Sequence, residues 1–152
     1  MIHFCKAKLS DIALMQALVK SEVDKGIIIF RSSDEMATNI RSYILAKEDS
    51  EIVGFGALHF HADDLAEIRS MVVKDGIRGQ GIGKGIVNTL LEEGRQLGVK
   101  RVFTLTYIKA FFEAVGFVEI PKESLPSHKI WADCIKCKHF PICDEIALIK
   151  NL

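Results

Sequence analysis

The chain has 152 residues, of which 49% are hydrophobic, and its 20 basic side chains balance its 20 acidic ones. This length fits one ordinary domain, so we expect a single domain over residues 1–152. The balanced charge argues against nucleic acid as a partner, and no stretch approaches the roughly 18 apolar residues of a membrane span. The opening residues lack the pattern of a signal peptide, so we expect a cytoplasmic protein with mostly reduced cysteines.

The first third of the chain predicts a strand and then helices. Residues 2–7 have the character of a short strand. Ser10-Asp11 offers N-caps for a helix whose apolar face is formed by Ile12, Met15, Leu18 and Val19. A turn then leads into the apolar run 27–31. Ser32 and Glu35 have the spacing of a capping box, and a helical stripe continues from them through Met36, Ile40, Tyr43 and Ile44.

The middle third predicts two hairpins and one long amphipathic helix. Residues 43–47 and 51–60 flank a short turn. A second turn at 62–64 feeds a strand over 66–73. Gly98 stands where a C-cap glycine belongs. The helix that it closes follows a glycine-rich loop and has an apolar face formed by Ile86, Val87, Leu90, Leu91 and Leu97.

The rest of the chain predicts three further strands and one short helix. Residues 102–106 are an apolar run suited to a buried strand. Residues 110–115 form a short helix closed by Gly116. Further strands are expected at 117–120 and 146–149. This order of elements indicates an α/β (α+β) fold with its strands in one mixed sheet.

The loop Arg78-Gly79-Gln80-Gly81-Ile82-Gly83 lies between a predicted strand and a predicted helix. Its glycines allow a tight turn and let phosphate oxygens approach the backbone amides. The helix that follows presents unpaired N–H groups and the positive end of its dipole. Arg78 and Lys84 add positive charge beside them. Together these features predict a cradle for a diphosphate group.

Other glycine-rich loops bind phosphates through different patterns. A Rossmann fingerprint requires G-x-G-x-x-G after the first strand, whereas this chain has G-x-G-x-G in its middle. A P-loop requires G-x-x-x-x-G-K-[ST], which is absent. A plain strand–turn–helix junction stays open as an alternative, although three glycines behind an arginine exceed what a turn requires.

The loop and its surroundings resemble the Gcn5-related N-acetyltransferases. Val72-Val73, a four-residue spacer and residues 78–83 are similar to the acetyl-CoA signature R/Q-x-x-G-x-G/A of that family, and residues 111–117 are similar to its later aromatic-x-x-x-Gly-Phe motif. The resemblance implies a mixed, mostly antiparallel central sheet with splayed middle strands, flanked by helices. It also implies that acetyl-CoA is bound by Val72, Val73, Arg78, Gly79, Gln80, Gly81, Ile82, Gly83 and Lys84.

One departure from the family concerns the general acid. Many members carry Tyr four residues before the Gly-Phe pair, where it protonates the leaving thiolate; this chain has Phe112 there. Tyr107, Thr106 and water are the candidates to replace it. Loss of a general acid without replacement costs about 10²–10⁴ in rate. Thiolate is a fair leaving group, so the reaction can survive this loss.

Residues 29–32, 66–70, 105–107, 111–112 and 125–129 resemble the acetyltransferase domain of N-acetylglutamate synthases, which also lacks the tyrosine. The resemblance implies glutamate or a similar amino acid as the acceptor, and a place in arginine biosynthesis. It implies that Glu67 is the base that deprotonates the ammonium group, through water. Arg31 would hold one substrate carboxylate bidentately and Lys129 the other. The implied substrate-binding set is Ile29, Arg31, Ser70 and Lys129.

Each of these roles has a structural alternative. Arg31 also fits a solvated end of an element, and Glu67 also fits a strand position that faces water. Arg69 shares the face of Glu67 in a regular strand and is open to three readings: pairing with Glu67, contact with substrate, or the surface. His59 and His61 share another strand face, and an isolated histidine more often has no catalytic role.

The cysteines near the C-terminus form a small cluster. Cys134, Cys137 and Cys143 follow the pattern C-x₂-C-x₅-C. The first pair has the spacing of zinc ligands, and the candidates for a fourth ligand are His139, His128 and Cys5. Free thiols are favoured, with a structural zinc or a disulfide as alternatives. We expect this segment to form a lid or edge over the acceptor site.

Three functions stay open. The first is acetylation of glutamate or a related small acid, the second is acetylation of a different amine such as a polyamine or a protein N-terminus, and the third is CoA binding without catalysis. A polyamine would require an acidic site, and the acidic residues near the predicted site are Glu67, Asp63 and Asp64. The expected partner is a small amine, without nucleic acid or membrane, and a homodimer is the expectation from base rates.

Overall fold

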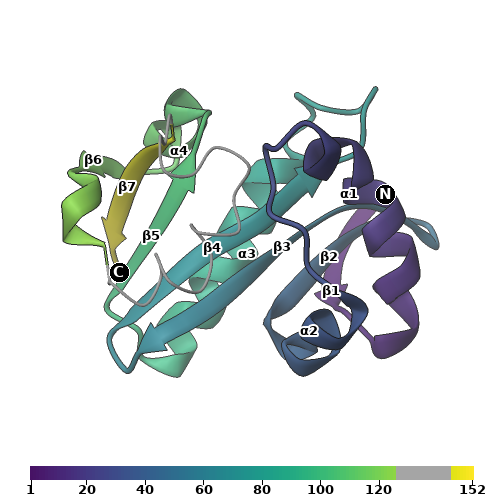
Figure 1. Cartoon of the computed structure of the whole chain (residues 1–152), viewed down its shortest axis with the longest axis horizontal. Helices are drawn as coiled ribbons and strands as arrows, with labels where there is room; N and C mark the ends of the chain where they lie inside the picture. The colour runs from purple at the N-terminus through teal and green to yellow at the C-terminus, as the bar shows by residue number, and fades with distance from the viewer. Residues whose placement is uncertain (126–144) are drawn as a thin grey trace.

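The computed structural model of the protein describes residues 1–125 and 145–152. Its strands, in chain order, are β1 (Ile2–Lys6), β2 (Tyr43–Glu48), β3 (Glu51–Ala62), β4 (Leu65–Val73), β5 (Arg101–Thr106), β6 (Val118–Ile120) and β7 (Ile146–Asn151). Within the described residues they form one seven-stranded sheet in the order β1-β2-β3-β4-β5-β7-β6 (Figure 1). Neighbouring strands run antiparallel except β4 and β5, which are parallel.

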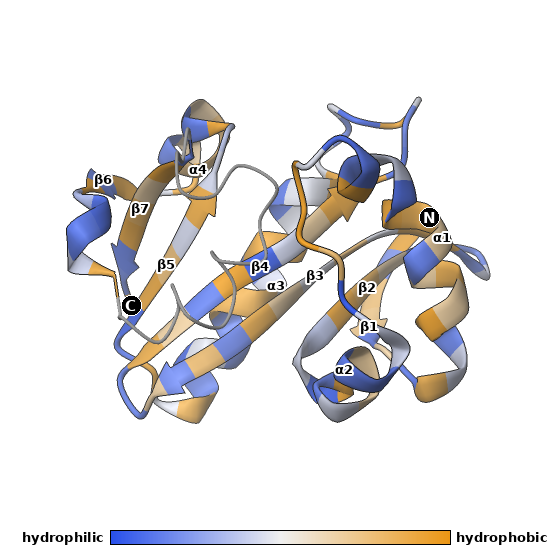
Figure 2. Ribbon diagram, viewed as in Figure 1, coloured by the Kyte–Doolittle hydropathy of each residue, from blue (hydrophilic) through white to orange (hydrophobic). Residues whose placement is uncertain are grey.

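Helices cover both faces of this sheet. They are α1 (Ile12–Asp24), α2 (Ser33–Thr38), α3 (Ile82–Leu97) and α4 (Lys109–Ala114). One core cluster joins α3 to the sheet and includes Leu58, Ala66, Ile68, Ile86 and Leu90. A second cluster joins α1 and α2 to the opposite face and includes Met15, Met36, Tyr43, Leu45 and Phe55 (Figure 2). None of the helices in the described residues has the length and apolarity that crossing a membrane requires.

The architecture confirms the expected fold, a mixed and mostly antiparallel sheet flanked by helices. Both hairpins, the long helix and the strand at the C-terminus lie where the sequence predicts them. Gly98 ends α3 with a φ of 89°, a left-handed conformation that glycine adopts without steric cost.

Two details of the predicted second helix are wrong. The helical stripe does not continue through Tyr43 and Ile44, because α2 ends at Thr38 and both residues begin β2. Ser32 does cap α2, since its hydroxyl accepts from the Glu35 amide at 3.1 Å. The Glu35 carboxylate, however, accepts from the Arg31 guanidinium at 2.9 Å instead of completing a capping box.

A β-bulge interrupts β4 at its middle. Phe55 of β3 pairs with Val72, but Ala57, two residues later, pairs with Arg69, so β4 carries one extra residue. Ser70 lies at this bulge with a φ of 58°, which is rare for a residue with a side chain. Its hydroxyl is hydrogen-bonded to the buried Tyr43 phenol. The extra residue moves Val72 into the core on the α1 side, whereas Ala66 packs on the α3 side.

The two parallel strands separate after a short paired stretch. The pairing between β4 and β5 covers Leu65 to Glu67 and Arg101 to Phe103. One step further, the Thr104 hydroxyl donates to the Ile68 carbonyl at 3.0 Å. Beyond that contact β4 runs on to Val73 without β5 beside it, and Figure 1 shows the two strands diverging. The expected splay of the middle strands is therefore present.

The bulge generates a prediction about stability at alkaline pH. Burial raises the pKa of the Tyr43 phenol above its ordinary 10.0, and the Arg31 and Arg69 guanidiniums offset part of that rise. The unfolded chain therefore ionises first, so Tyr43 stabilises the fold fully below pH 10.0 and loses that contribution as pH rises through its raised pKa. A tenfold difference in proton affinity between the folded and unfolded chain corresponds to about 1.4 kcal/mol.

The free energy of unfolding is measured by urea melts at pH 8 and at the highest pH at which both proteins still refold. We expect it to fall more between these two pH values in wild type than in Tyr43→Phe. The substitution removes the hydroxyl whose ionisation this burial opposes. Tyr107→Phe is the matched control, because Tyr107 is 38% exposed and its loss should leave the wild-type drop in place. Equal losses in wild type and Tyr43→Phe would contradict the prediction.

Candidate active site

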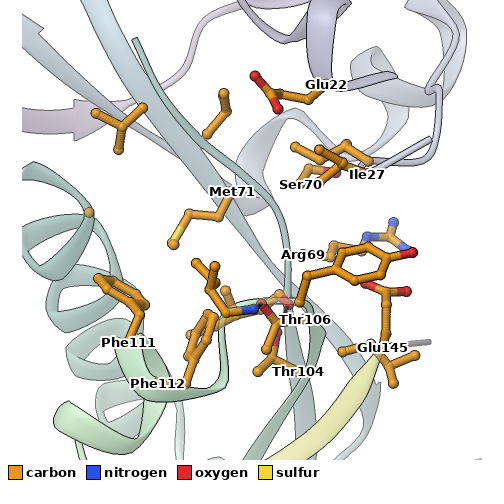
Figure 3. A pocket seen from close by; sticks show the side chains of 18 of the residues that line it. Glu22, Ile27, Arg69, Ser70, Met71, Thr104, Thr106, Phe111, Phe112 and Glu145 are labelled. Carbon is orange, nitrogen blue, oxygen red and sulfur yellow. Dashed lines mark hydrogen bonds between the residues drawn. The ribbon is translucent and has the colours of Figure 1, made fainter. Parts of the chain in front are cut away.

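A pocket of about 600 Å³ opens where β4 and β5 separate. Its wall includes the glycine-rich loop at one end and the middle of β4 at the other. Figure 3 shows Phe111 and Phe112 on one side, with Glu22 and Ile27 on the other. One cavity therefore connects the predicted phosphate cradle with the predicted acceptor end.

The glycine-rich loop has the backbone shape expected of an anion site. Gly76, Gly79 and Gly81 have φ values of 89°, 87° and 82°, and a Cβ on any of them would meet nothing within 4 Å. Glycine is therefore needed here for its backbone conformation rather than for lack of space. The first α3 amide with an acceptor in its own helix is Gly85, which donates to the Gly81 carbonyl at 3.0 Å.

The amides of residues 82–84 come before that first helical bond and so have no carbonyl one turn earlier to accept them. They lie at the positive end of the α3 dipole. The cavity lining includes Arg78, Gly79, Gly81, Gly83 and Lys84. Gln80 is exposed outside that lining, and the Ile82 side chain is buried in the core. Any contact of Ile82 with an anion would therefore use its backbone N–H.

Arg78 is held in place by two acidic groups and one carbonyl. Its guanidinium lies 3.1 Å from Glu22 Oε1 and 3.1 Å from Asp75 Oδ1, and its Nε donates to the Val73 carbonyl at 3.0 Å. Glu22 is buried near the end of α1. Its backbone carbonyl also accepts from the amides of Ile27 and Ile28 at 2.9 and 3.3 Å. Glu22 thus ties the glycine-rich loop to the segment that leads to Arg31.

Val72 and Val73 line the cavity on the side of β4 that has no neighbouring strand. Gly83 approaches the opposite wall closely, because a Cβ there would lie 3.3 Å from the Phe111 ring. Gly83 of α3 and Phe111 of α4 therefore lie close together in the wall of the cavity.

Glu67 lies in the wall of the pocket and is nearly inaccessible to solvent, at 1% exposure. Its Oε1 is 2.9 Å from Nε2 of His61, whose side chain is also buried. The predicted base thus has a titratable partner, a histidine that the sequence analysis names without linking it to Glu67. The signal was available in the hairpin register, since the turn after Ala62 places His59 opposite Glu67.

The predicted acceptor residues meet at the other end of the cavity. Ile29, Arg31 and Ser70 all contribute to its lining, as does Arg69. Arg31 is buried, with Nη1 2.9 Å from Glu35 Oε2 and its carbonyl accepting from Gln16. Residues 27–31 adopt no helix or strand, so Arg31 reaches the site from a loop.

Arg69 and Glu145 are two charged lining residues that sequence reasoning left unassigned or missed. Both line the cavity, and Figure 3 shows them at the same end. Arg69 keeps the face of Glu67, because the bulge begins only after it. Glu145 immediately precedes β7 in a segment of irregular sequence, where no periodicity indicated its position.

The candidates for the general acid also lie in the cavity wall. Tyr107 is 38% exposed there. The Thr106 hydroxyl accepts from the Ile108 amide at 3.0 Å, which leaves its own proton available for donation. Phe112 is buried between Phe111 and Phe117, with ring centroids 5.1 and 5.3 Å away. Its packing role agrees with its lack of a proton to donate.

Some predicted residues lie outside the described part of the chain. These are Lys129 and the zinc candidates Cys134, Cys137 and Cys143, with the ligand candidates His128 and His139 and the expected lid. Cys5, the other candidate, is a half-buried free thiol on β1. The described residues hold no group of three or more His, Cys, Asp or Glu side chains placed to bind a metal.

Comparison with known proteins identifies relatives in sequence. The model of the acetyltransferase (GNAT) family matches residues 13–118. An uncharacterized N-acetyltransferase of Chlorobaculum tepidum is 36% identical over 146 residues, which cover 96% of this chain and 94% of the relative. An amino-acid acetyltransferase of Mycobacterium tuberculosis is 35% identical over 118 residues, which cover 76% of this chain and 67% of the relative.

Solved structures agree with the fold. The N-acetylglutamate synthase of Neisseria gonorrhoeae, complexed with coenzyme A and N-acetyl-glutamate, matches with a TM-score of 0.88 at 21% identity over all of this chain. The chain spans only 35% of the length of that synthase. Rv2747 of Mycobacterium tuberculosis, in complex with CoA, matches with a TM-score of 0.85 at 25% identity over 99% of both chains. From the family model and the sequence relatives, this chain belongs to the GNAT family of N-acetyltransferases.

Proposed function

We propose that the protein transfers the acetyl group of acetyl-CoA to the α-amine of glutamate or a related amino acid. One observation carries this proposal. A single cavity joins the amides at the start of α3 to the Glu67 carboxylate and the Arg31 guanidinium. The likeness to an amino-acid acetyltransferase at 35% identity supports the acceptor class.

The residues at the α3 end suit coenzyme A. Its diphosphate would be held by the amides of residues 79–84 and the Lys84 ammonium, because N–H groups at a helix start attract anions. Arg78 supports this loop through its bonds to Val73 and Glu22. The pantetheine arm would lie along Val72 and Val73, where the open edge of β4 offers backbone hydrogen bonds. The structural neighbour Rv2747 was solved in complex with CoA, which supports CoA as the ligand.

The acceptor end suits an amino acid with an acidic side chain. Arg31 has the planar fork that binds a carboxylate bidentately, and Glu35 fixes one of its nitrogens. Arg69 brings a second guanidinium to the same cavity. Glu67 and Glu145 line the same cavity, so the preference for a dicarboxylate over a polyamine rests on the two guanidiniums, which attract carboxylates and repel ammonium groups.

Acetyl-CoA supplies the thioester carbonyl that the amine attacks. The amine must first lose a proton, and Glu67 is a carboxylate in the wall that would accept it, directly or through water. Ser70 and Arg31 would hold the amino acid so that its nitrogen faces the thioester, which is the positioning that raises the effective concentration of a reactant. Thr106 or Tyr107 would donate to the leaving sulfur.

The acceptor class is tested by following thiol release from acetyl-CoA across a panel of amines. We expect glutamate, or another amino acid with an acidic side chain, to stimulate release well above the hydrolysis background. Spermidine and a peptide N-terminus should give little. Turnover with spermidine or the peptide instead of an amino acid would show that the proposed acceptor class is wrong. CoA binding without turnover on any amine would indicate a binding module without catalytic activity.

The glycine cradle is tested by a matched pair of substitutions at the two ends of α3. Gly81 and Gly98 have φ values of 82° and 89°, and both have open space around a Cβ. Alanine should therefore cost each a similar ~1–2 kcal/mol of folding stability. Only Gly81→Ala should also weaken CoA binding, by about tenfold or ~1.4 kcal/mol, in calorimetric titrations. Equal CoA affinity of Gly81→Ala and Gly98→Ala would contradict the role of the glycine-rich loop in binding the diphosphate.

The carboxylate clamp is tested at Arg31. Arg31→Ala should raise the acceptor KM about 10- to 100-fold, since a hydrogen bond to a charged group is worth ~1.5–3 kcal/mol. The CoA dissociation constant should stay nearly unchanged, because Arg31 lies at the far end of the cavity. Arg41→Ala, an exposed arginine outside the cavity lining, is the control. Parallel losses for both substrates would count against the clamp and in favour of a folding defect.

A further inference from the structure

Glu67 and His61 form a buried pair next to the pocket. Their side chains are 2% and 3% exposed, and Glu67 Oε1 lies 2.9 Å from His61 Nε2. They come from adjacent antiparallel strands, Glu67 from β4 and His61 from β3. A carboxylate removed from water this completely is costly unless a hydrogen bond compensates for its lost hydration. His61 provides that compensation.

The surroundings of His61 are largely aromatic. Its ring lies 5.3 Å from the Phe103 ring of β5 and 4.9 Å from the His59 ring, which it meets edge to face. Glu67 on β4 and His59 on β3 are titratable groups that face it, and β5 faces it with the uncharged Phe103. His61 is thus placed in contact with Glu67 without entering the lining of the cavity.

Acetyl transfer to an ammonium group releases a proton that must leave the site. The C–N bond forms, the thioester C–S bond breaks, and the nitrogen loses two protons. One of them ends on the thiol of CoA, and the other goes to solvent. With acceptor and acetyl-CoA filling the pocket, solvent would have little access to Glu67 from the cavity side. His61 contacts Glu67 and does not line the cavity, so it is placed to share the proton until the products leave.

We propose that Glu67 and His61 accept this proton as one unit, with His61 a positioning residue that acts through Glu67. Before transfer the pair is a carboxylate with a neutral imidazole and carries one negative charge. After transfer it holds one more proton and has no net charge. The 2.9 Å contact between Glu67 Oε1 and His61 Nε2 lets the two side chains share that proton.

This proposal rests on the proposed acetyl transfer and adds a second residue to its proton path. It separates His61 from a purely structural partner, which would only hold the Glu67 carboxylate by a hydrogen bond. Glutamine at position 61 keeps an N–H donor near Glu67 but cannot take a proton. We expect His61→Gln to lower kcat about tenfold or more, with the roughly 10²–10⁴ of a fully lost acid–base group as the upper range, and to leave acceptor KM and CoA affinity nearly unchanged.

A rescue experiment distinguishes proton uptake from packing. His61→Ala leaves a space for a small ring, and we expect added imidazole to restore much of its kcat. Pyrazole has nearly the same shape but is too weak a base to hold the proton, so it should restore little. Glu67→Gln should not respond to imidazole, because His61 acts through Glu67. His3→Ala, which alters an exposed histidine on β1, should behave as wild type.

Wild-type kcat in His61→Gln, or equal rescue of His61→Ala by imidazole and pyrazole, would overturn the proposal and leave His61 as packing. If thermal melting shows that His61→Ala is unfolded, the size-matched His61→Gln decides alone. If wild type acetylates no amine, the proposed function fails and this inference fails with it. If wild type acetylates an amine and His61→Gln has the same kcat, only the proposed proton sharing by His61 is rejected, and the proposed function stands.

Discussion

The end of the pairing between β4 and β5 is the constraint on which the site depends. Backbone groups on the open edge of β4 would be costly if they were buried without partners. Two side chains satisfy part of that edge, since the Thr104 hydroxyl donates to the Ile68 carbonyl and Arg78 Nε donates to the Val73 carbonyl. The groups between them face the cavity. An extended ligand with amides of its own, such as pantetheine, can pair with such an edge.

The bulge in β4 also shapes the cavity that opens where the pairing between β4 and β5 ends. It begins after Arg69, so Glu67 and Arg69 keep one face of β4, and its extra residue turns Val72 to that same face, into the core on the α1 side. The left-handed backbone of Ser70 carries a strain of about 1–3 kcal/mol, typical of residues in rare conformations at functional sites. Its bond to Tyr43 helps to hold that conformation. Backbone strain, buried charge and an unpaired strand edge thus occur together in the middle of β4. Each of them costs stability, and such features are typical of functional sites.

Much of this could be predicted from local patterns, and the misses share a physical cause. Turn residues and alternation located both hairpins, and the glycines located the start of α3. The bulge could not be predicted from the sequence, because Ser70 is not a glycine and the apolar residues around it have the pattern of a regular strand. The pairing of His61 with Glu67 depends on the register set by the turn after Ala62, which composition alone does not give. The stripe from Met36 to Ile44 misled because helical and strand spacing overlap in short apolar runs.

Glu22 shows how the two ends of the cavity are connected. Its carboxylate binds Arg78 beneath the glycine-rich loop, and its carbonyl accepts from Ile27 and Ile28, just before the residues that carry Arg31. A side chain and a backbone group of one residue thereby position the candidate diphosphate site and the candidate carboxylate clamp. The segment 27–31 has no regular structure of its own, so these bonds substitute for a strand or helix in fixing it. Order at the CoA end therefore supports order at the acceptor end, because both depend on the same turn of α1.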